Sequence, residues 1–289
     1  MSRLIVLVAA VSLVLSACST TPPAAAPASP HAGQEGRAIE LPPTHGVFDY
    51  QLGGPSERVE TADGHLDPDV VVRDASAPPP SGAYGICYVN GFQTQPGEED
   101  AWLERSDLLL GDGDDGFVRD PAWPDELVLD PSTESQRAGI LEVLGPVIAS
   151  CAAAGYDAVE IDNLDTWTRF PEIDRSGAHA LAAAYVALAH EAGLAIGQKN
   201  AAEIAPFAHD ELGFDFAISE ECAAFDECGD YTAVYGDHLL QVEYPEALDE
   251  AGLTLAEACS LEDRAPTMIL RDRDLAPAGD AGHRYERCD

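Results

Sequence analysis

Three acidic residues, Glu160, Asp162 and Asp165, lie on or just after a short apolar stretch and are the first candidates for chemistry in this sequence. Residues 158–161 predict a buried strand, and side-chain alternation places Glu160 and Asp162 on the same face of it. Carboxylates held this close raise one another's pKa. The alternative is a solvated loop in an acid-rich chain, and the residues at the other strand ends decide between the two.

Further polar and aromatic side chains fall at or just past the ends of other predicted strands. They are Asp49, Tyr88, Asn90, Lys199, Asn200, Glu220, Glu243 and Tyr244. Each of these residues also has an ordinary structural interpretation. Asp49 could cap a turn, Tyr88 could pack in the core, and Lys199 could form an ion pair that only stabilises the fold. Taken together, they form a ring of carboxylates around the one lysine of the chain, with aromatic side chains among them. Such a ring suits cleavage of a glycosidic bond, which needs two flanking carboxyl groups and aromatic rings that stack on sugar faces.

The elements that must position these residues alternate between strand and helix. Short apolar strands are predicted at 47–50, 70–72, 84–89, 158–161, 194–197, 214–218, 239–242 and 267–270. Helical patterns at about 130–154, 175–192 and 247–258 separate several of them. We therefore expect an α/β fold, a single (β/α)8 TIM barrel, in which parallel strand ends converge on one face. A doubly wound sheet is less suitable because no Gly-rich phosphate loop follows the first strand.

Two helix starts are predicted from capping residues. Asp130 and Pro131 fit the N-cap and first position of the helix that ends before Gly155. Asn200 and Glu203 have the spacing of a capping box, which predicts a helix directly after the strand at 194–197. The apolar residues at 127–129 are assigned to a loop of the barrel.

The charge of the chain limits its partners. The 289 residues include 52 acidic and 15 basic ones, with a formal net charge of -37. A field of this sign repels phosphates, so neither nucleic acid nor an anionic membrane surface is expected as a partner. A cationic ligand would be attracted, although the same charge also favours solubility in a salty or wall-rich setting.

The N-terminus has the pattern of an export signal. Arg3 precedes an apolar run at 4–15 that is too short to span a bilayer comfortably. The sequence at 15–18 resembles a bacterial lipobox, so residues 1–17 are predicted to be a lipoprotein signal peptide and Cys18 the lipidated residue. An ordinary secretory signal that leaves Cys18 free is the alternative. The protein would be exported and anchored at the cell surface or membrane, touching the membrane through its lipid only.

Composition divides the mature chain into two parts. Residues 18–43 are rich in Ala, Pro and Ser and predict a disordered tether, because they have almost no large apolar side chains to bury. Residues 44–289 are predicted to be the folded domain. We expect the protein to be a monomer.

Six cysteines follow the predicted anchor, and an even number in an exported domain predicts three disulfides. Cys222 and Cys228 are close enough to close a small loop, and a Cys259–Cys288 bond would tie back the C-terminal tail. These pairs leave Cys87 for Cys151. Because there is no C-x-x-C pair and the His residues lack ligand spacing, we expect no metal and no cofactor.

Seven blocks of the sequence carry a family resemblance. They are Phe48–Leu52, Cys87–Tyr88, Asp157–Asp165, Gly197–Asn200, Phe214–Cys222, Glu227–Cys228 and Val242–Tyr244. In content and order they are similar to the signature blocks of glycoside hydrolase family 114. That family comprises endo-α-1,4-polygalactosaminidases, TIM-barrel enzymes that act on galactosamine-containing polysaccharide. The chain departs from the family pattern between residues 89 and 130, which affects the subsites on that side.

The resemblance implies roles for individual residues. Asp162 and Glu220 match the catalytic pair. Because Asp162 is nearer in sequence to the strand-end amides of Asn163 and Leu164, we expect it to be the ionised partner and Glu220 to be the general acid. The expected substrate-binding residues are Asp49, Tyr88, Glu160, Asp165, Lys199, Glu243 and Tyr244. The expected partner is a polysaccharide substrate, a cationic galactosamine polymer. A non-catalytic surface lipoprotein that only binds such a polymer is the alternative.

Overall fold

The computed structural model describes residues 38–113 and 116–288. The chain divides into two units, and the second, residues 36–289, contains every described residue. The predicted signal peptide and Cys18 lie outside the described residues, as does most of the predicted tether. Its last six residues, 38–43, are described and contact the folded domain. Tyr84 donates a hydrogen bond of 2.6 Å to the carbonyl of Glu40, and His238 lies 3.1 Å from the carbonyl of Pro42.

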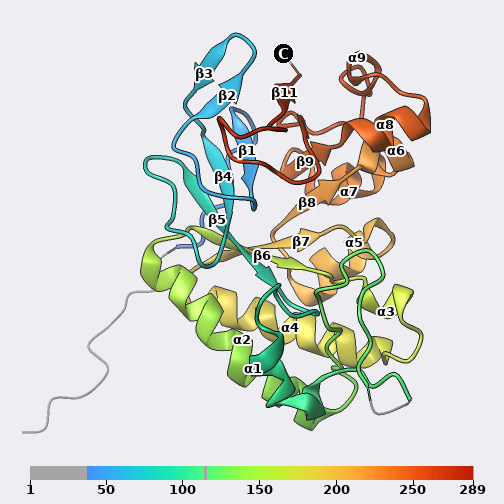
Figure 1. Cartoon of the computed structure of the whole chain (residues 1–289). Helices are drawn as coiled ribbons and strands as arrows, with labels where there is room; N and C mark the ends of the chain where they lie inside the picture. Colours follow the sequence, from blue (N-terminus) through green and yellow to red (C-terminus); the bar gives the residue numbers. More distant parts are fainter. Residues whose placement is uncertain (1–37, 114–115, 289) are drawn as a thin grey trace, which may run out of the picture. The chain divides into compact units, whose positions relative to one another are not determined.

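A curled and mainly parallel sheet forms the centre of the domain (Figure 1). In spatial order its strands are β1 (Phe48–Gln51), β4 (Val70–Asp74), β5 (Tyr84–Asn90), β6 (Ala158–Asp162), β7 (Ala195–Lys199), β8 (Phe216–Glu220), β9 (Leu239–Glu243), β10 (Ile269–Arg271) and β11 (Tyr285–Arg287). All pairs are parallel except β10 with β11. The eight predicted strands are thus confirmed, in the order that a barrel requires.

The alternation of strand and helix is less regular than predicted. A hairpin of β2 (Val59–Thr61) and β3 (Gly64–Leu66) connects β1 to β4. The segment 75–83 connects β4 to β5 and contains the consecutive prolines 78–80, which have no N–H groups for a helix. Neither connection forms a helix, so the described fold is a mixed α/β fold in which the first two βα units are incomplete.

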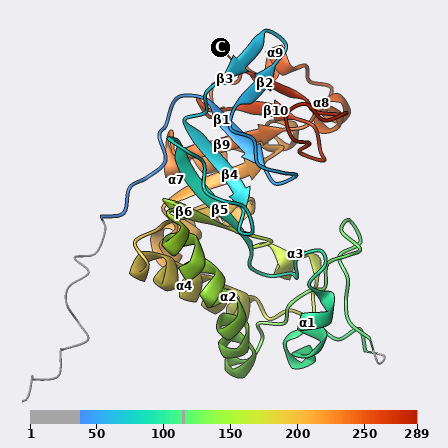
Figure 2. The same cartoon turned by 60° about the vertical axis from the view of Figure 1, so that its left-hand side comes forward.

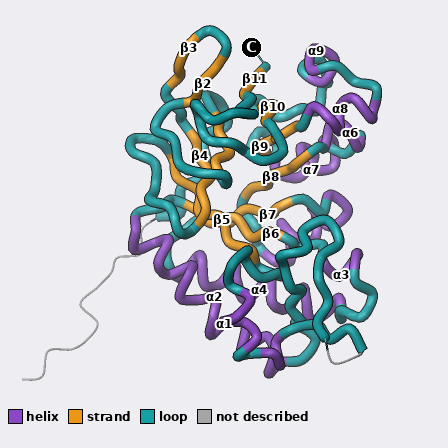
Figure 3. The backbone as a smooth tube through the Cα atoms, in the orientation of Figure 1, coloured by secondary structure: helices purple, strands orange, loops and turns teal. Residues whose placement is uncertain are grey.

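Helices cover the remainder of the sheet in two groups (Figures 1 and 2). The helices after β5 and β6 are α1 (Glu99–Leu103), α2 (Glu134–Ala154), α3 (Thr166–Arg169) and α4 (Arg175–Glu191), with the 3-10 turn η1 (Ser106–Leu108). After β7 come η2 (Ala202–Ile204), α5 (Ala205–Phe207) and the π-helical η3 (Ala208–Leu212). The later helices are α6 (Cys222–Phe225), α7 (Cys228–Tyr235), α8 (Pro245–Ala251) and α9 (Leu255–Ala258). Figure 3 shows that most of the segment between β5 and α2 is loop, and residues 127–129 lie in it as predicted.

The start of α2 corrects one prediction. The helix begins at Glu134, and Thr133 caps it through a capping box with Gln136. Asp130 lies before the helix, where it accepts hydrogen bonds from the backbone of Ser132 and from the side chain of Gln136. The Asp-Pro pair therefore opens the turn that leads into the helix, whereas a threonine with Gln at N3 satisfies the free N–H groups.

Helix α2 is the one described helix that is long and apolar enough to cross a bilayer. It packs beside α4 and buries Ile140, Leu144 and Ile148 within the domain. A disulfide from Cys151 to Cys87 also ties it to β5. We therefore interpret it as a helix of the folded domain that buries one face.

Strand alternation divides the core into two clusters. Val159 and Ile161 of β6 face the helices and belong to the cluster between sheet and helices. Ala158 faces the other way, into the curl of the sheet, where it meets Phe216 and Ile218 of β8. The polar residues that alternate with Val159 and Ile161 therefore point into the curl, as the period of two predicts.

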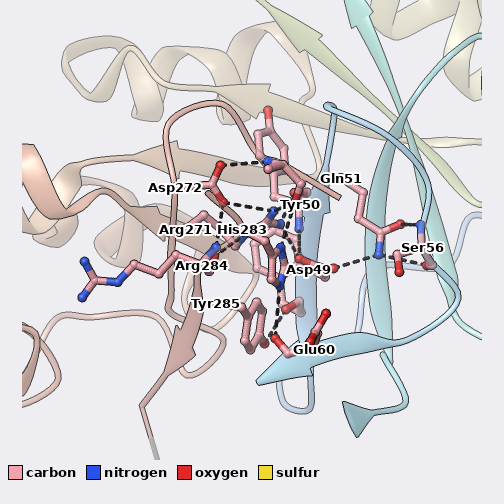
Figure 4. A network of polar contacts seen from close by, with 12 residues as sticks. Asp49, Tyr50, Gln51, Ser56, Glu60, Arg271, Asp272, His283, Arg284 and Tyr285 are labelled. Carbon is pink, nitrogen blue, oxygen red and sulfur yellow. Dashed lines mark hydrogen bonds and ion pairs between the residues drawn. The ribbon is translucent and has the colours of Figure 1, made fainter. Parts of the chain in front are cut away.

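Side chains join β1, at one end of the sheet, to the last parallel strand β10 and to β11, the other end. No backbone ladder forms between β1 and these two strands within the described residues (Figure 4). Buried Arg271 of β10 donates to the Oδ1 of Asp49 at 2.6 Å and also to the carbonyl of Tyr50. The hydroxyl of Tyr285 donates to the carbonyl of Phe48 at 2.8 Å. These bonds fix β1 to the last parallel strand.

All three predicted disulfides are present. They are Cys87–Cys151, Cys222–Cys228 and Cys259–Cys288.

Candidate active site

Lys199, at the end of β7, is the centre of the polar cluster inside the curled sheet. Its side chain is 3% exposed, and its Nζ lies 3.6 Å from Glu160 Oε1, 3.3 Å from Asp162 Oδ1 and 2.8 Å from Glu220 Oε2. The three carboxyl groups come from β6 and β8, the two strands that flank β7. Three carboxyl groups of the predicted ring, those of Glu160, Asp162 and Glu220, therefore surround the lysine.

The register of the sheet places a glycine beside the polar cluster. Gly197 lies opposite Glu160 in the register of β6 and β7. A Cβ atom on Gly197 would come within 2.6 Å of the ring of Phe216, so this strand position has to be glycine. The absence of a Cβ at Gly197 leaves the room that the Phe216 ring occupies.

Asp162 is held in its charged form. Burial alone would raise its pKa, but Lys199 and hydrogen bonds from the Tyr88 hydroxyl, at 2.7 Å, and the Asn163 backbone, at 2.8 Å, outweigh that effect and lower it. Three donors thus converge on one carboxylate. Asp162 is available as a base or nucleophile at neutral pH.

Glu160 is in the opposite state. Burial raises its pKa to about 8, and the nearby charge of Asp162 adds to this effect. The charge of Lys199 acts in the opposite direction but does not outweigh them. The Tyr50 hydroxyl donates to its Oε1 at 2.7 Å, whereas its Oε2 is buried and has no hydrogen-bond partner among the described residues. Glu160 is therefore mostly protonated at neutral pH, and the cluster contains fewer negative charges than carboxyl groups.

Glu220 is oriented from three sides. Its Oε1 accepts a hydrogen bond from the Tyr244 hydroxyl, and its Oε2 lies 2.8 Å from Lys199. Its backbone N–H donates to the side chain of Asn200 at 2.8 Å. The predicted capping box at Asn200 is wrong, because Asn200 has a positive φ of 49° and Ala201 is the N-cap of the short 3-10 turn that follows. The side-chain oxygen of Asn200 instead binds the strand that carries Glu220.

A cavity of about 540 Å³ opens above this cluster, and we call it the active-site cavity. It is lined by Tyr50, Leu52, Gly53, Asp74, Tyr88, Gln95, Pro96, Trp123, Glu126, Asp162, Asn163, Asp165, Arg169, Lys199, Asn200, Glu220, Glu221, Tyr244, Arg273, Asp274 and Leu275. Every one of the parallel strands β1 and β4–β10 contributes residues from, or just after, its carboxyl end. This is the face on which barrel enzymes build their active sites.

Six of the nine predicted site residues line the active-site cavity. They are Tyr88, Asp162, Asp165, Lys199, Glu220 and Tyr244. The other three, Asp49, Glu160 and Glu243, are buried beneath or beside it, so the structure does not place them in contact with a substrate. Asp49 is the partner of Arg271, and Glu243 accepts from the backbone N–H of Ala223 and the side chain of Gln241. These residues support the strands that carry the cavity.

The long segment after β5 adds lining residues that the strand pattern did not identify. Glu126 is buried and accepts a hydrogen bond of 3.0 Å from Asn90. Burial, reinforced by the charge of Asp162, raises its pKa to about 7. Trp123 also lines the cavity and is more than half exposed. The only sequence signal for these two residues was the Trp-Pro-Asp-Glu run in the segment that departs from the family pattern.

Arginines were also missed as lining residues. Arg273 pairs with Glu221, and its guanidinium lies 4.3 Å from the centre of the Tyr244 ring. This stacking fixes the ring whose hydroxyl holds Glu220. Arg169 forms ion pairs with Asp120 and Asp165 on the other side of the cavity.

One group of described residues has the spacing of metal ligands, namely Cys222, Cys228 and Glu243. The two sulfur atoms are bonded to each other, so neither is a thiolate that could bind an ion.

Residues 28–289 match the model of glycoside-hydrolase family GH114. Among solved structures, Ega3 from Aspergillus fumigatus in complex with galactosamine is similar with a TM-score of 0.64 and 18% identity, over 89% of this chain and 100% of that chain. The glycoside hydrolase domain of PelA from Pseudomonas aeruginosa is similar with a TM-score of 0.54 and 20% identity, over 81% and 97% of the two chains. A comparison with curated protein sequences gave no match.

Proposed function

Because the chain belongs to glycoside hydrolase family GH114 and is therefore a glycoside hydrolase, we propose that it cleaves α-1,4-linked galactosamine polysaccharide with Asp162 and Glu220. The observation that carries this proposal is the position of the two carboxyl groups on either side of Lys199 at the floor of the active-site cavity. The nearest oxygens of the pair are at most 6.1 Å apart, because Nζ lies 3.3 Å from one and 2.8 Å from the other.

This spacing favours hydrolysis with retention of configuration. Retaining pairs stand about 5–5.5 Å apart, and inverting pairs about 6.5–9.5 Å apart, which leaves room for a water molecule. Asp162 would attack the anomeric carbon and form a glycosyl ester while Glu220 donates its proton to the leaving oxygen. Glu220 would then accept a proton from the water that hydrolyses the ester. Proton NMR of the first released product should show the α-anomer, and an initial β-anomer would require inversion.

Lys199 and Glu160 set the charge at the floor of the active-site cavity. Lys199 lowers the pKa of Asp162 and keeps the carboxylate ready for attack. Glu160 is mostly neutral at pH 7, so it fills the space behind Lys199 without adding a further negative charge to the floor. In this way one small cavity supports a charged carboxylate beside a group that donates a proton.

The acidic lining supports a cationic substrate. Asp74, Asp165 and Glu126 line the active-site cavity in addition to the catalytic pair, and the whole chain carries a charge of -37. An ammonium group near a carboxylate gains about 1–4 kcal/mol at close range, depending on the effective dielectric constant. The related Ega3 structure contains galactosamine, an amino sugar that carries such an ammonium group.

The experiment that tests this function compares amino-sugar polymers that differ in acetylation. Release of reducing ends should be faster from de-N-acetylated α-1,4-galactosamine polymer than from the fully N-acetylated form. The KM should rise with added salt, because partly exposed charge pairs are screened over about 10 Å. Equal rates on both polymers, insensitive to salt, would show that the acidity is a surface trait unrelated to the substrate. Binding without release would instead support the non-catalytic alternative.

We also propose that the domain is a single TIM barrel, with helices missing after β1 and β4, that is exported, tethered through residues 18–43 and anchored by a lipid on Cys18, and that it works as a monomer. The lipobox-like sequence at 15–18 supports the anchor, and the closure of β1 onto β10 supports the barrel. Incorporation of labelled fatty acid in wild type and its absence in Cys18→Ser would test the anchor. Sedimentation of the soluble form would test the oligomeric state.

A further inference from the structure

A second hollow of about 370 Å³ opens next to the active-site cavity. Helices α6 and α8, which pack against each other, provide most of its lining. Glu221 and Arg273 line both this hollow and the active-site cavity. These two residues form an ion pair, which separates the active-site cavity from the second hollow. A polysaccharide that extends from the cavity past this ion pair would enter the second hollow.

Phe225, at the end of α6, gives the second hollow an unusual aromatic side chain. It is 66% exposed, the largest exposed fraction among the large hydrophobic residues that the structure describes. The Cys222–Cys228 disulfide closes the loop that carries it, and two residues close to it, Glu221 and Asp226, have positive φ angles, of 69° and 58°. The ring is thus presented to solvent by a constrained turn. Rigid exposed aromatic rings are the groups on which sugar faces stack.

The charge around the ring is negative. Glu246 and Glu250 lie one turn apart on the exposed surface of α8 and line the hollow. No ion pair joins either of them to another residue of the described part of the chain, whereas the one cation at the site, Arg273, is paired with Glu221. An amino sugar has both complementary properties, since it combines an apolar ring face with an ammonium group.

We propose that this second hollow is a subsite that binds a galactosamine unit of the substrate outside the active-site cavity, beyond the ion pair of Glu221 and Arg273. The subsite stacks one sugar on Phe225 and pairs its ammonium with Glu246 and Glu250. It rests on the proposed function, since its ligand is a further part of the same polymer. Its role is to add binding energy for long chains while leaving the reacting centre unchanged.

The test measures kinetics of the whole protein on a galactosamine tetrasaccharide and on the long polymer. Phe225→Ala should raise the KM for the polymer about three- to tenfold, as expected for the loss of one stacking contact, with kcat unchanged. Kinetics on the tetrasaccharide, which spans both depressions in fewer binding registers than the polymer, should change less than kinetics on the polymer. Glu250→Gln should raise the polymer KM about two- to fivefold, and only at low salt. Phe207→Ala, which removes an exposed phenylalanine outside both hollows, is the matched control. It should change the KM and kcat for neither substrate.

Several results would overturn the subsite. They are an unchanged polymer KM in Phe225→Ala, or an equal loss on the tetrasaccharide. A change of sedimentation in Phe225→Ala without a kinetic effect would mean that the ring packs against a second copy of the chain. If wild type releases no reducing ends from either substrate, the proposed function fails first and the subsite fails with it. Normal wild-type activity, with variants that leave the kinetics unchanged, refutes the subsite alone.

Discussion

The neutral state of Glu160 gives the sharpest test of the electrostatics of the site. With a pKa of about 8, this side chain is about nine-tenths protonated at pH 7. Glutamine has nearly the same shape as protonated glutamate and retains an oxygen that can accept the hydrogen bond from Tyr50. Glu160→Gln should therefore fold and change the free energy of unfolding at acidic pH by less than about 1 kcal/mol, within the range of an isosteric change.

The pH dependence of the same variant has a defined sign. An unfolded glutamate has a pKa of about 4.3, so between about pH 5 and pH 8 folded wild type keeps a proton that the unfolded chain has lost. Glu160 thus lowers wild-type stability by up to about 1.4 kcal/mol for each pH unit in this window, and the loss levels off above the folded pKa. Because the glutamine of the Glu160→Gln variant cannot titrate, the stability of the variant relative to wild type should rise by about 3.5 kcal/mol from pH 5 to pH 8.

Urea denaturation of both proteins at several pH values, with the disulfides intact, measures this difference. Subtracting wild type from variant cancels the titration of the other acids. Glu191→Gln, which removes a carboxylate from the exposed end of α4, is the matched control, and the relative gain should be confined to Glu160→Gln. A flat difference between pH 5 and pH 8 would show that Glu160 is charged in the folded protein. The account of the site as one charged and one neutral carboxyl group on β6 would then be wrong.

Two further substitutions test the supports of the site. Arg271→Met should lower the free energy of unfolding by about 3–5 kcal/mol, because it leaves Asp49 buried without its cation. Arg284→Met removes a half-exposed arginine and is the control, and it should lower the free energy of unfolding by less than about 1 kcal/mol in the same denaturation assay. Equal losses of stability in the two variants would contradict the role given to the contact between β1 and β10. Tyr244→Phe removes the hydroxyl that holds Glu220 and should lower kcat about tenfold or more while leaving stability nearly unchanged. A wild-type kcat in this variant would mean that the hydroxyl does not orient the acid.

The sequence predicted the strands and the central cluster because both follow from local rules. Short apolar runs between turn and helix signals located the eight parallel strands. The period of two placed Glu160 and Asp162 on the inner face of β6. The missing helices after β1 and β4 were not predicted, since a barrel model assumes regular units. The proline run at 78–80 was the available warning.

The sequence could not predict which strand-end residues would point into the cavity. Asp49 faces Arg271, which is 222 positions away, and only the closure of the sheet brings them together. Glu243 accepts a hydrogen bond from the backbone of Ala223, and this contact also forms only when the sheet is folded. The states of the acids depend on burial and on distances to Lys199, which no sequence pattern encodes. The acidic segment that adds Trp123 and Glu126 to the cavity is mostly loop, where neither period applies.

The central claim is that Asp162 and Glu220 together cleave a galactosamine polymer. The most direct measurement is the release of reducing ends from de-N-acetylated α-1,4-galactosamine polymer by wild type, Asp162→Asn and Glu220→Gln, with polymer binding measured in parallel. Wild type should release them steadily, and each variant should be slower by orders of magnitude while folding and binding polymer about as well as wild type. Near wild-type rates in either variant would contradict the assignment of the catalytic pair.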